Sequence, residues 1–152
     1  MLMKLGALLG DKTEATVLDL PSERWLWDKS ADCPTPQFTY QVPDTLPPEV
    51  AAVVSISNSA TKPSSLEVVE FRAVAPNRGI IRTEAHLQAF RREFNAFLMQ
   101  LIRAGVRHLH IHPATPLCAS VEIGRTLLPK TFESVYVWEW QAPEWRKVLR
   151  LK

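Results

Sequence analysis

Cysteine, glycine and the motifs of common enzymes are scarce in this sequence. It holds 2 cysteines among 152 residues, and Cys33 and Cys118 lie far apart with no second cysteine at metal-ligand spacing. This excludes a disulfide framework and a zinc ribbon. The 5 glycines form no Rossmann fingerprint or phosphate loop, and no nucleophile elbow or paired-carboxylate pattern is present. These absences favour binding over catalysis and predict no cofactor.

An excess of charge of one sign is missing as well. The 18 basic and 16 acidic residues leave a formal net charge of +2, which is too balanced to coat a nucleic-acid duplex or to hold a membrane surface. The tail from Glu144 to Lys152 is locally basic. We interpret it as a solvated terminus, with contact to a small anionic partner as the alternative.

Long hydrophobic runs are also absent. The apolar segment 1–10 is too short to cross a membrane, and no small-residue cleavage site precedes Asp11. We therefore expect a cytoplasmic protein without a membrane partner. What is present is a composition of 46% hydrophobic and 22% charged residues, typical of a soluble domain that buries roughly 70% of its unfolded surface.

Proline divides the amino-terminal part of the chain into short intervals. We predict a strand at Ala15–Leu20, a strand or helical turn at Glu23–Lys29, and an edge strand at Phe38–Val42. We interpret residues 1–49 as a proline-rich extension that packs on a core formed by residues 50–152.

The pattern becomes regular from Val50 onward. The continuous apolar run Val50–Ser57 is typical of a parallel strand covered on both faces. A second strand is predicted at Leu66–Ala73, and Ile80–Arg82 is a candidate extension of the sheet. Thr83 is the predicted N-cap of a long amphipathic helix, which ends at Gly105.

Further elements are predicted towards the carboxyl end. They are a strand at Val106–His112, a helix at Thr115–Leu128 and a strand at Phe132–Trp140. The alternation of strands and helices predicts an α/β fold with a mainly parallel sheet flanked by helices.

His108, His110 and His112 alternate with apolar residues, so a strand would point all of them to one face. They are a reasonable zinc-ligand set, but ligands normally come from more than one element and no carboxylate lies nearby as a base. We favour the alternative without a metal. In it, His108 lies near solvent, His110 is hydrogen-bonded in the interior, and His112 alone reaches the functional edge.

The segment His112–Pro116 is expected at the carboxyl end of its strand, where open α/β sheets bind ligands. Thr115 is predicted to cap the next helix and Pro116 to take its first position. The amides of Leu117 and Cys118 would then point toward an anion.

A second polar segment, Ser55–Lys62, is also expected at the carboxyl end of a strand. It offers hydroxyls, an amide and a lysine that can bind nucleobase edges or phosphate oxygens. An ordinary surface turn is the equally favoured alternative.

The stretch His110–Arg125, followed by Leu127–Pro129 and a strand at Val135–Trp140, resembles the carboxyl-terminal part of SAVED domains. These are the cyclic-oligonucleotide sensors of bacterial CBASS and some type III CRISPR systems. In that family a strand runs into a small-residue helix, a proline and a final strand. The matching positions here are Ala114, Pro116, Ser120, Gly124 and Arg125. The order of the preceding blocks agrees, so the resemblance covers roughly residues 50–140.

The resemblance implies a Rossmann-like (CARF-like) fold and a binding sensor of a cyclic tri- or tetranucleotide that controls assembly and activation of an antiviral effector. SAVED domains usually contain two fused CARF-like halves, and this chain is long enough for about one. A homo-oligomer or a second sensor subunit is therefore implied, with the effector in a fused or separate chain. The residues expected to bind the ligand are Ser57, Asn58, Ser59, Lys62, His112, Pro113, Ala114, Thr115 and Trp140.

Alternatives remain at this stage for the function and for single residues. A ring nuclease would use His112 as general acid or base, and a ligand-free assembly domain would make contacts through the basic tail and exposed tryptophans. Arg125 lies about 15 Å from the start of its helix, so we expect it to brace the sheet or an interface. Close packing explains Gly124 as well as a ligand does.

Overall fold

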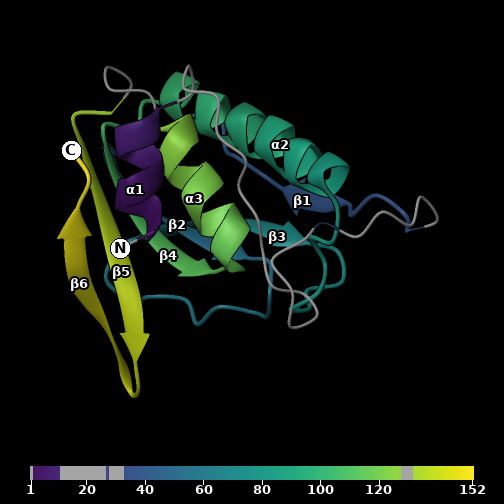
Figure 1. The fold of residues 1–152 in the computed structure, drawn as a ribbon. Helices are drawn as coiled ribbons and strands as arrows, with labels where there is room; N and C mark the ends of the chain where they lie inside the picture. The colour runs from purple at the N-terminus through teal and green to yellow at the C-terminus, as the bar shows by residue number, and fades with distance from the viewer. Residues whose placement is uncertain (1, 11–26, 28–32, 128–131) are drawn as a thin grey trace.

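The structure, a computed structural model, describes residues 2–10, 27, 33–127 and 132–152. Three helices lie on one face of a six-stranded sheet (Figure 1). The helices are α1 (Leu2–Leu9), α2 (Glu84–Arg103) and α3 (Leu117–Thr126). The strands are β1 (Phe38–Tyr40), β2 (Glu49–Ser55), β3 (Glu67–Ala73), β4 (His108–Ala114), β5 (Ser134–Gln141) and β6 (Glu144–Arg150).

The sheet has the order β1-β3-β2-β4-β5-β6. Strands β3, β2, β4 and β5 run parallel, and β1 and β6 pair antiparallel at the two edges. The predicted α/β class with a mainly parallel sheet is confirmed. The central strand β2 is the apolar run seen in the sequence, and Val50 to Val54 are fully buried, as expected for a strand covered on both faces.

The core between the sheet and α2 is aromatic. Phe71 of β3 contacts Phe90, Phe94 and Phe97 of α2, with ring centroids 5.4 to 5.9 Å apart. These rings are fully buried, and burial of each contributes about 1.5–3 kcal/mol. The predicted helix start is confirmed, because Thr83 Oγ1 accepts a hydrogen bond from the amide of His86 at 3.1 Å.

Parts of the sequence-based interpretation need correction. Residues 80–82 form no strand, and the tail read as a solvated terminus is largely the edge strand β6. The tail was misread because most residues of β6 are charged, namely Glu144, Arg146, Lys147 and Arg150, and lysine and arginine are common on a protected edge strand. The elements predicted at residues 15–20 and 23–29 lie outside the described residues, except Trp27. The domain boundary at residue 50 stays a prediction.

Helices α1 and α3 cross at two glycines. A Cβ atom added at Gly124 would overlap the backbone of Met3, and one added at Gly6 would overlap the backbone of Val121. Only residues without a side chain allow the two helix backbones to approach this closely. The close-packing interpretation of Gly124 therefore holds, and its packing partner is α1.

We expect Gly124→Ala to destabilise the protein by about 1–3 kcal/mol, because the new methyl group forces α1 and α3 apart. Thermal or urea unfolding followed by circular dichroism measures the change. The matched control is Gly79→Ala, where the nearest atom to the added Cβ is 3.8 Å away. The control is expected to leave stability unchanged or slightly raised. Equal stability of both variants would contradict the crossing described above.

Candidate functional site

The strand order reverses between β2 and β4, because the chain leaves β2 towards β3 on one side and later returns to β4 on the other. Open α/β sheets bind ligands at the carboxyl ends of the strands next to such a switch point. The two strand ends are fastened together there. The amides of Ile56 and Ser57 both donate to the carbonyl of Ala114, at 2.9 and 2.8 Å.

The start of α3 differs in detail from the prediction. The helix begins at Leu117, and Pro116 is the N-cap residue without a side-chain hydrogen bond. Thr115 therefore does not cap the helix. Its Oγ1 atom is instead 2.8 Å from the hydroxyl of Ser120. Pro116 has an extended backbone, with φ −65° and ψ 165°, so the helix begins one residue later than predicted. The helix N-terminus itself lies where the sequence placed it, at the end of β4.

A crevice of about 650 Å³ opens beside this helix start. Its lining includes Pro113, Thr115 and Trp140, which were expected from the sequence to bind a ligand, and further residues that were not expected to. Among the latter are Lys4 of α1, Ser120 of α3 and Leu149 of β6. The crevice thus joins the two ends of the chain across the edge of the sheet. Sequence periodicity cannot show this, because α1 and β6 are distant in sequence.

The polar segment after β2 folds over the face of the sheet that lies opposite the helices. Ser55 Oγ donates to Glu70 at 3.1 Å and accepts from the amide of Ala60 at 3.1 Å. Lys62 Nζ lies 3.1 Å from Glu70 Oε2, and its side chain is 61% exposed. Asn58 and Ser59 are exposed. Ser57, Asn58 and Ser59 line neither this crevice nor the smaller slot described below.

The histidine side chains of β4 lie on the same face of the sheet as this segment, opposite the helices. His108 is partly exposed and its Nδ1 is 2.9 Å from Ser134 Oγ. His110 is buried, accepts a hydrogen bond from Trp138 Nε1 on Nδ1, and donates from Nε2 to Glu49 Oε1 at 2.8 Å. Burial lowers the pKa of His110, opposed by Glu49. The predicted positions of His108 and His110 are therefore confirmed.

His112 lies elsewhere than predicted, because it is buried rather than at an open edge. Its side chain is 1% exposed. The ring stacks on Trp138 with centroids 5.1 Å apart and makes a T-shaped contact with Trp145 at 4.8 Å. Burial, with a smaller contribution from His110, lowers the pKa of His112 to about 4. The imidazole is therefore neutral at pH 7, and neither ring nitrogen has a hydrogen-bond partner among the described residues.

A smaller slot of about 310 Å³ adjoins His112 on this face. The segment Thr61–Ser65 forms one side of it, and Trp138, Trp140 and Trp145 form the other. Trp145 Nε1 donates to the carbonyl of Thr61 at 2.9 Å and ties the two sides together. The sequence reasoning missed Trp138 and Trp145 as site residues. The alternation Tyr136, Trp138, Trp140 beside the alternating histidines was the signal that they share one face.

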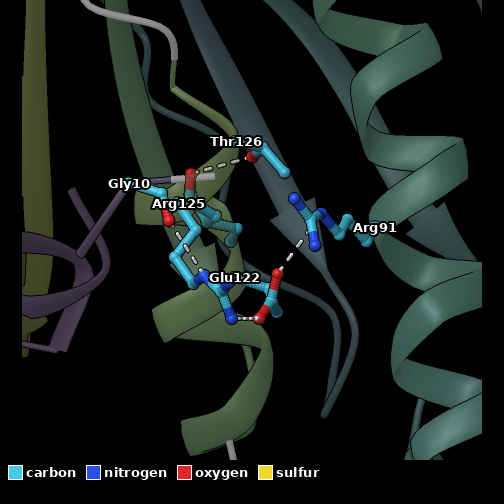
Figure 2. A network of polar contacts seen from close by, with 6 residues as sticks. Gly10, Arg91, Glu122, Arg125 and Thr126 are labelled. Carbon is cyan, nitrogen blue, oxygen red and sulfur yellow. Dashed lines mark hydrogen bonds and ion pairs between the residues drawn. The ribbon is translucent and has the colours of Figure 1, made fainter. Parts of the chain in front are cut away.

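Arg125 forms a buried polar network near the carboxyl-terminal end of α3 (Figure 2). Its Nη1 donates to Glu122 Oε1 at 3.0 Å and its Nε donates to the carbonyl of Gly10 at 3.2 Å. Arg91 of α2 lies 3.7 Å from the other carboxylate oxygen of Glu122. Arg125 therefore braces α3 to the end of α1, whereas the contact with the sheet or an interface that was expected from the sequence stays a prediction.

No group of metal-ligating side chains with the geometry of a metal site is found within residues 2–10, 33–127 and 132–152. Within the same residues, no helix is long and apolar enough to cross a membrane.

A protein-family model described as the "SMODS-associated and fused to various effectors sensor domain", SAVED, matches residues 1–151. No curated protein matches the chain. Among solved structures, the Acinetobacter baumannii Cap4 SAVED/CARF-domain receptor with the cyclic trinucleotide 3'3'3'-cAAA has a TM-score of 0.57 at 12% identity, covering 82% of this chain and 28% of the receptor.

The same receptor with 2'3'3'-cAAA has a TM-score of 0.58 at 15% identity, with 75% and 27% covered. The Moraxella osloensis Cap4 receptor has a TM-score of 0.53 at 13% identity, with 74% and 25% covered. The likeness establishes a shared SAVED/CARF fold, which is Rossmann-like. The chain spans about a quarter of the length of these receptors.

Proposed function

The chain belongs to the SAVED family of sensor domains, and from this membership we propose that it binds a cyclic tri- or tetranucleotide as a non-catalytic sensor. The crevice of about 650 Å³ at the start of α3 is the observation that carries the proposal. It offers a helix N-terminus for a phosphate, a hydroxyl at Thr115 and a base-stacking surface at Trp140.

One lysine, one glutamate and two tryptophans are among the residues that line the crevice, and the lysine and the tryptophans suit such a ligand. Lys4 provides a cation on the α1 side, and Trp140 is 42% exposed on the β5 side. A phosphate placed between Lys4 and the first amides of α3 would gain charge-assisted hydrogen bonds. Bases stack on tryptophan with little dependence on their identity, so this surface contributes affinity rather than selectivity.

The chain covers about a quarter of the length of the similar receptors, and its proposed mode of action takes this into account. A cyclic ligand presents repeated phosphates and bases, so a second copy of the chain or a second sensor subunit would complete the site. We propose that the ligand bridges α1 and β6, elements from the two ends of the chain, and so changes how sensor units assemble. The effector of an antiviral response would follow in a fused or separate chain.

The segment Ser57–Lys62 has a lesser part in this proposal. Lys62 is paired with Glu70, so it can bind a phosphate only by exchanging partners. Ser57, Asn58 and Ser59 retain a role as a second wall where a neighbouring subunit closes over the strand ends.

Ring cleavage, the enzymatic alternative, assigned proton transfer to His112. A general acid or base must lie within hydrogen-bond reach of the group that it protonates or deprotonates. His112 is 1% exposed, and its pKa is lowered to about 4. No observation therefore favours cleavage, and sensing remains the proposal.

Calorimetric titration with a panel of cyclic di-, tri- and tetranucleotides tests the proposal. We expect one ring to bind and Thr115→Val to weaken its binding about threefold to tenfold, because one hydrogen bond is lost. The matched control is Thr39→Val on β1, at the far edge of the sheet, which is expected to bind as the parent does. A panel that gives no heat with any ring, at concentrations up to the millimolar range, would refute the proposed function.

A further inference from the structure

The hairpin of β5 and β6 carries a strip of aromatic and basic side chains on the sheet face opposite the helices. The members of this hairpin strip are Tyr136, Trp138, Trp140, Trp145, Lys147 and Arg150. Contacts of its rings with the histidines of β4 place it on that face. No helix among the described elements covers this face (Figure 1), and every member of the strip is at least partly exposed. The strip is therefore open to a partner.

The two cations of the strip are held over aromatic rings. In the register of the hairpin, Lys147 lies opposite Trp138 and Arg150 lies opposite Tyr136. The ammonium of Lys147 is 4.1 Å from the ring centroid of Tyr136 and 5.4 Å from that of Trp138. The guanidinium of Arg150 is 5.9 Å from the ring centroid of Tyr136. Contacts between a cation and a ring face hold the cation in place without neutralising it.

Neither cation is paired with an aspartate or a glutamate among the described residues. Arg150 donates from Nε to the main-chain oxygen of Lys152 at 2.6 Å. Its terminal nitrogens have no hydrogen-bond partner within the part of the chain that the structure describes. Lys147 and Arg150 can therefore bind an anion without giving up an ion pair.

The carboxylates near the strip do not offset these two charges. Successive side chains of a strand point to opposite faces, so Glu139 projects to the helix side, where it lines the crevice. Glu144, at the start of β6, is paired with Arg146 at 3.2 Å. Glu49, at the start of β2, is hydrogen-bonded to His110 at 2.8 Å. The strip is thus locally basic although the chain as a whole is nearly neutral.

Trp140 is the open ring of the strip. It is 42% exposed, and its one ring contact among the described residues is a T-shaped contact with Trp145 at 5.4 Å. Tyr136 and Trp138 instead lie between Lys147 and the histidines of β4. These two rings support the cation, whereas Trp140 can accept a planar base on its surface.

We propose that the hairpin strip binds single-stranded nucleic acid, with phosphates at Lys147 and Arg150 and a base on Trp140. The three positions follow one another along the hairpin, each about two residues or roughly 6.6–6.8 Å from the next. Such a line suits a linear chain of repeated phosphates and bases. A basic track beside an aromatic stacking surface is the usual means of holding a single strand without reading its sequence. Two cations are too few to hold a duplex, whose bases are not free to stack.

The inference does not depend on the proposed function. Lys147 and Arg150 line neither the crevice nor the slot. Trp140 lines the crevice as well, so a change at Trp140 would affect both proposals. The tests therefore use the two cations.

Fluorescence anisotropy of labelled single-stranded RNA and DNA, each about 12 nucleotides long, measures binding by the whole chain. Titrations are repeated at several salt concentrations. Two phosphate contacts predict that the logarithm of the affinity falls with the logarithm of the salt concentration with a slope of about −1.4. Lys147→Gln and Arg150→Gln are each expected to weaken binding about threefold to tenfold and to reduce the slope by about 0.7.

Arg146→Gln is the matched control, because it removes one cation from the same strand. Arg146 is 62% exposed but projects from the other face and is paired with Glu144, so the variant is expected to bind as the parent does. Circular dichroism checks that each variant is folded. Three results would each overturn the inference: no binding of either strand at about 100 μM protein and low salt, equal losses in Arg146→Gln and Lys147→Gln, or a duplex that binds as tightly as its single strands.

The panel of cyclic oligonucleotides, titrated into Lys147→Gln, separates this inference from the proposed function. Ring binding is expected to be unchanged in this variant, and strand binding is expected to be unchanged in Thr115→Val. Binding of a ring without binding of any strand overturns the strip and keeps the sensor. Strand binding that depends on Lys147, without binding of any ring, overturns the sensor and keeps the strip.

Discussion

Replacing Arg125 by methionine is expected to lower the free energy of unfolding by about 3–5 kcal/mol, the largest effect of any single substitution considered for this chain. The guanidinium and the Glu122 carboxylate are both buried, and their contact is 3.0 Å long. Without Arg125, the only ion-pair partner of Glu122 among the described residues is Arg91, at 3.7 Å. In the variant, the buried carboxylate of Glu122 is still removed from water, but it has lost most of the attraction to a cation that offsets the cost of its desolvation.

The matched variants are Glu122→Leu and the double variant Glu122→Leu/Arg125→Met. Because an apolar pair of similar volume requires no compensation, the double variant is expected to be more stable than Arg125→Met alone. Urea unfolding of all four proteins at pH 7 gives the coupling energy of the pair. An Arg125→Met protein that unfolds at the parent's urea concentration would contradict the network in Figure 2.

Loss of Arg125 has a second expected consequence, for ligand binding. Arg125 donates to the carbonyl of Gly10, at the end of α1, and α1 forms the wall of the crevice that carries Lys4. Ring binding by Arg125→Met is therefore expected to weaken even at temperatures where the variant is folded. The double variant lacks the same contact to Gly10, so it should share this defect although its stability is largely restored.

Much of the fold could be predicted from the sequence because the relevant signals are local. The apolar run at Val50, the helical spacing from Leu87 to Leu101 and the Thr83 cap each act within a few residues. The edge strand β6 was not predicted because most of its residues are charged and they do not alternate regularly with apolar ones. The sequence alone does not distinguish such a segment from a solvated tail.

The candidate site could be predicted only in part, for a related reason. The strand end at Ala114 and the helix start at Leu117 follow from chain order, so the place of the crevice was predictable. Lys4 joins it only because Gly6 and Gly124 let α1 lie against α3, a contact between residues far apart in sequence. His112 was expected at an open edge, whereas Trp145 from the unpredicted strand covers it.

Acidification is expected to destabilise the protein through His112. Its pKa is about 4 in the folded state and 6.5 in an unfolded chain, so between these values the unfolded chain binds a proton that the folded chain does not. Stability contributed by the neutral imidazole is therefore complete above pH 6.5 and is lost as the pH falls towards 4. The separation of the two values corresponds to roughly 3 kcal/mol.

His112→Phe isolates this contribution, because phenylalanine keeps the stacking on Trp138 and has no proton to bind. Urea unfolding at pH 7, 6, 5 and 4.5 should show a steep loss of stability in the parent and a shallower one in the variant. The variant keeps His110, whose pKa is also lowered by burial, and it keeps every carboxylate, so the difference between the two curves belongs to His112.

At pH 7 the variant should already be more stable by about 1–3 kcal/mol, because it removes the orphaned nitrogens. Parallel curves for the two proteins would instead show that the imidazole is protonated as easily in the folded chain as in the unfolded one, and that His112 is not buried as described.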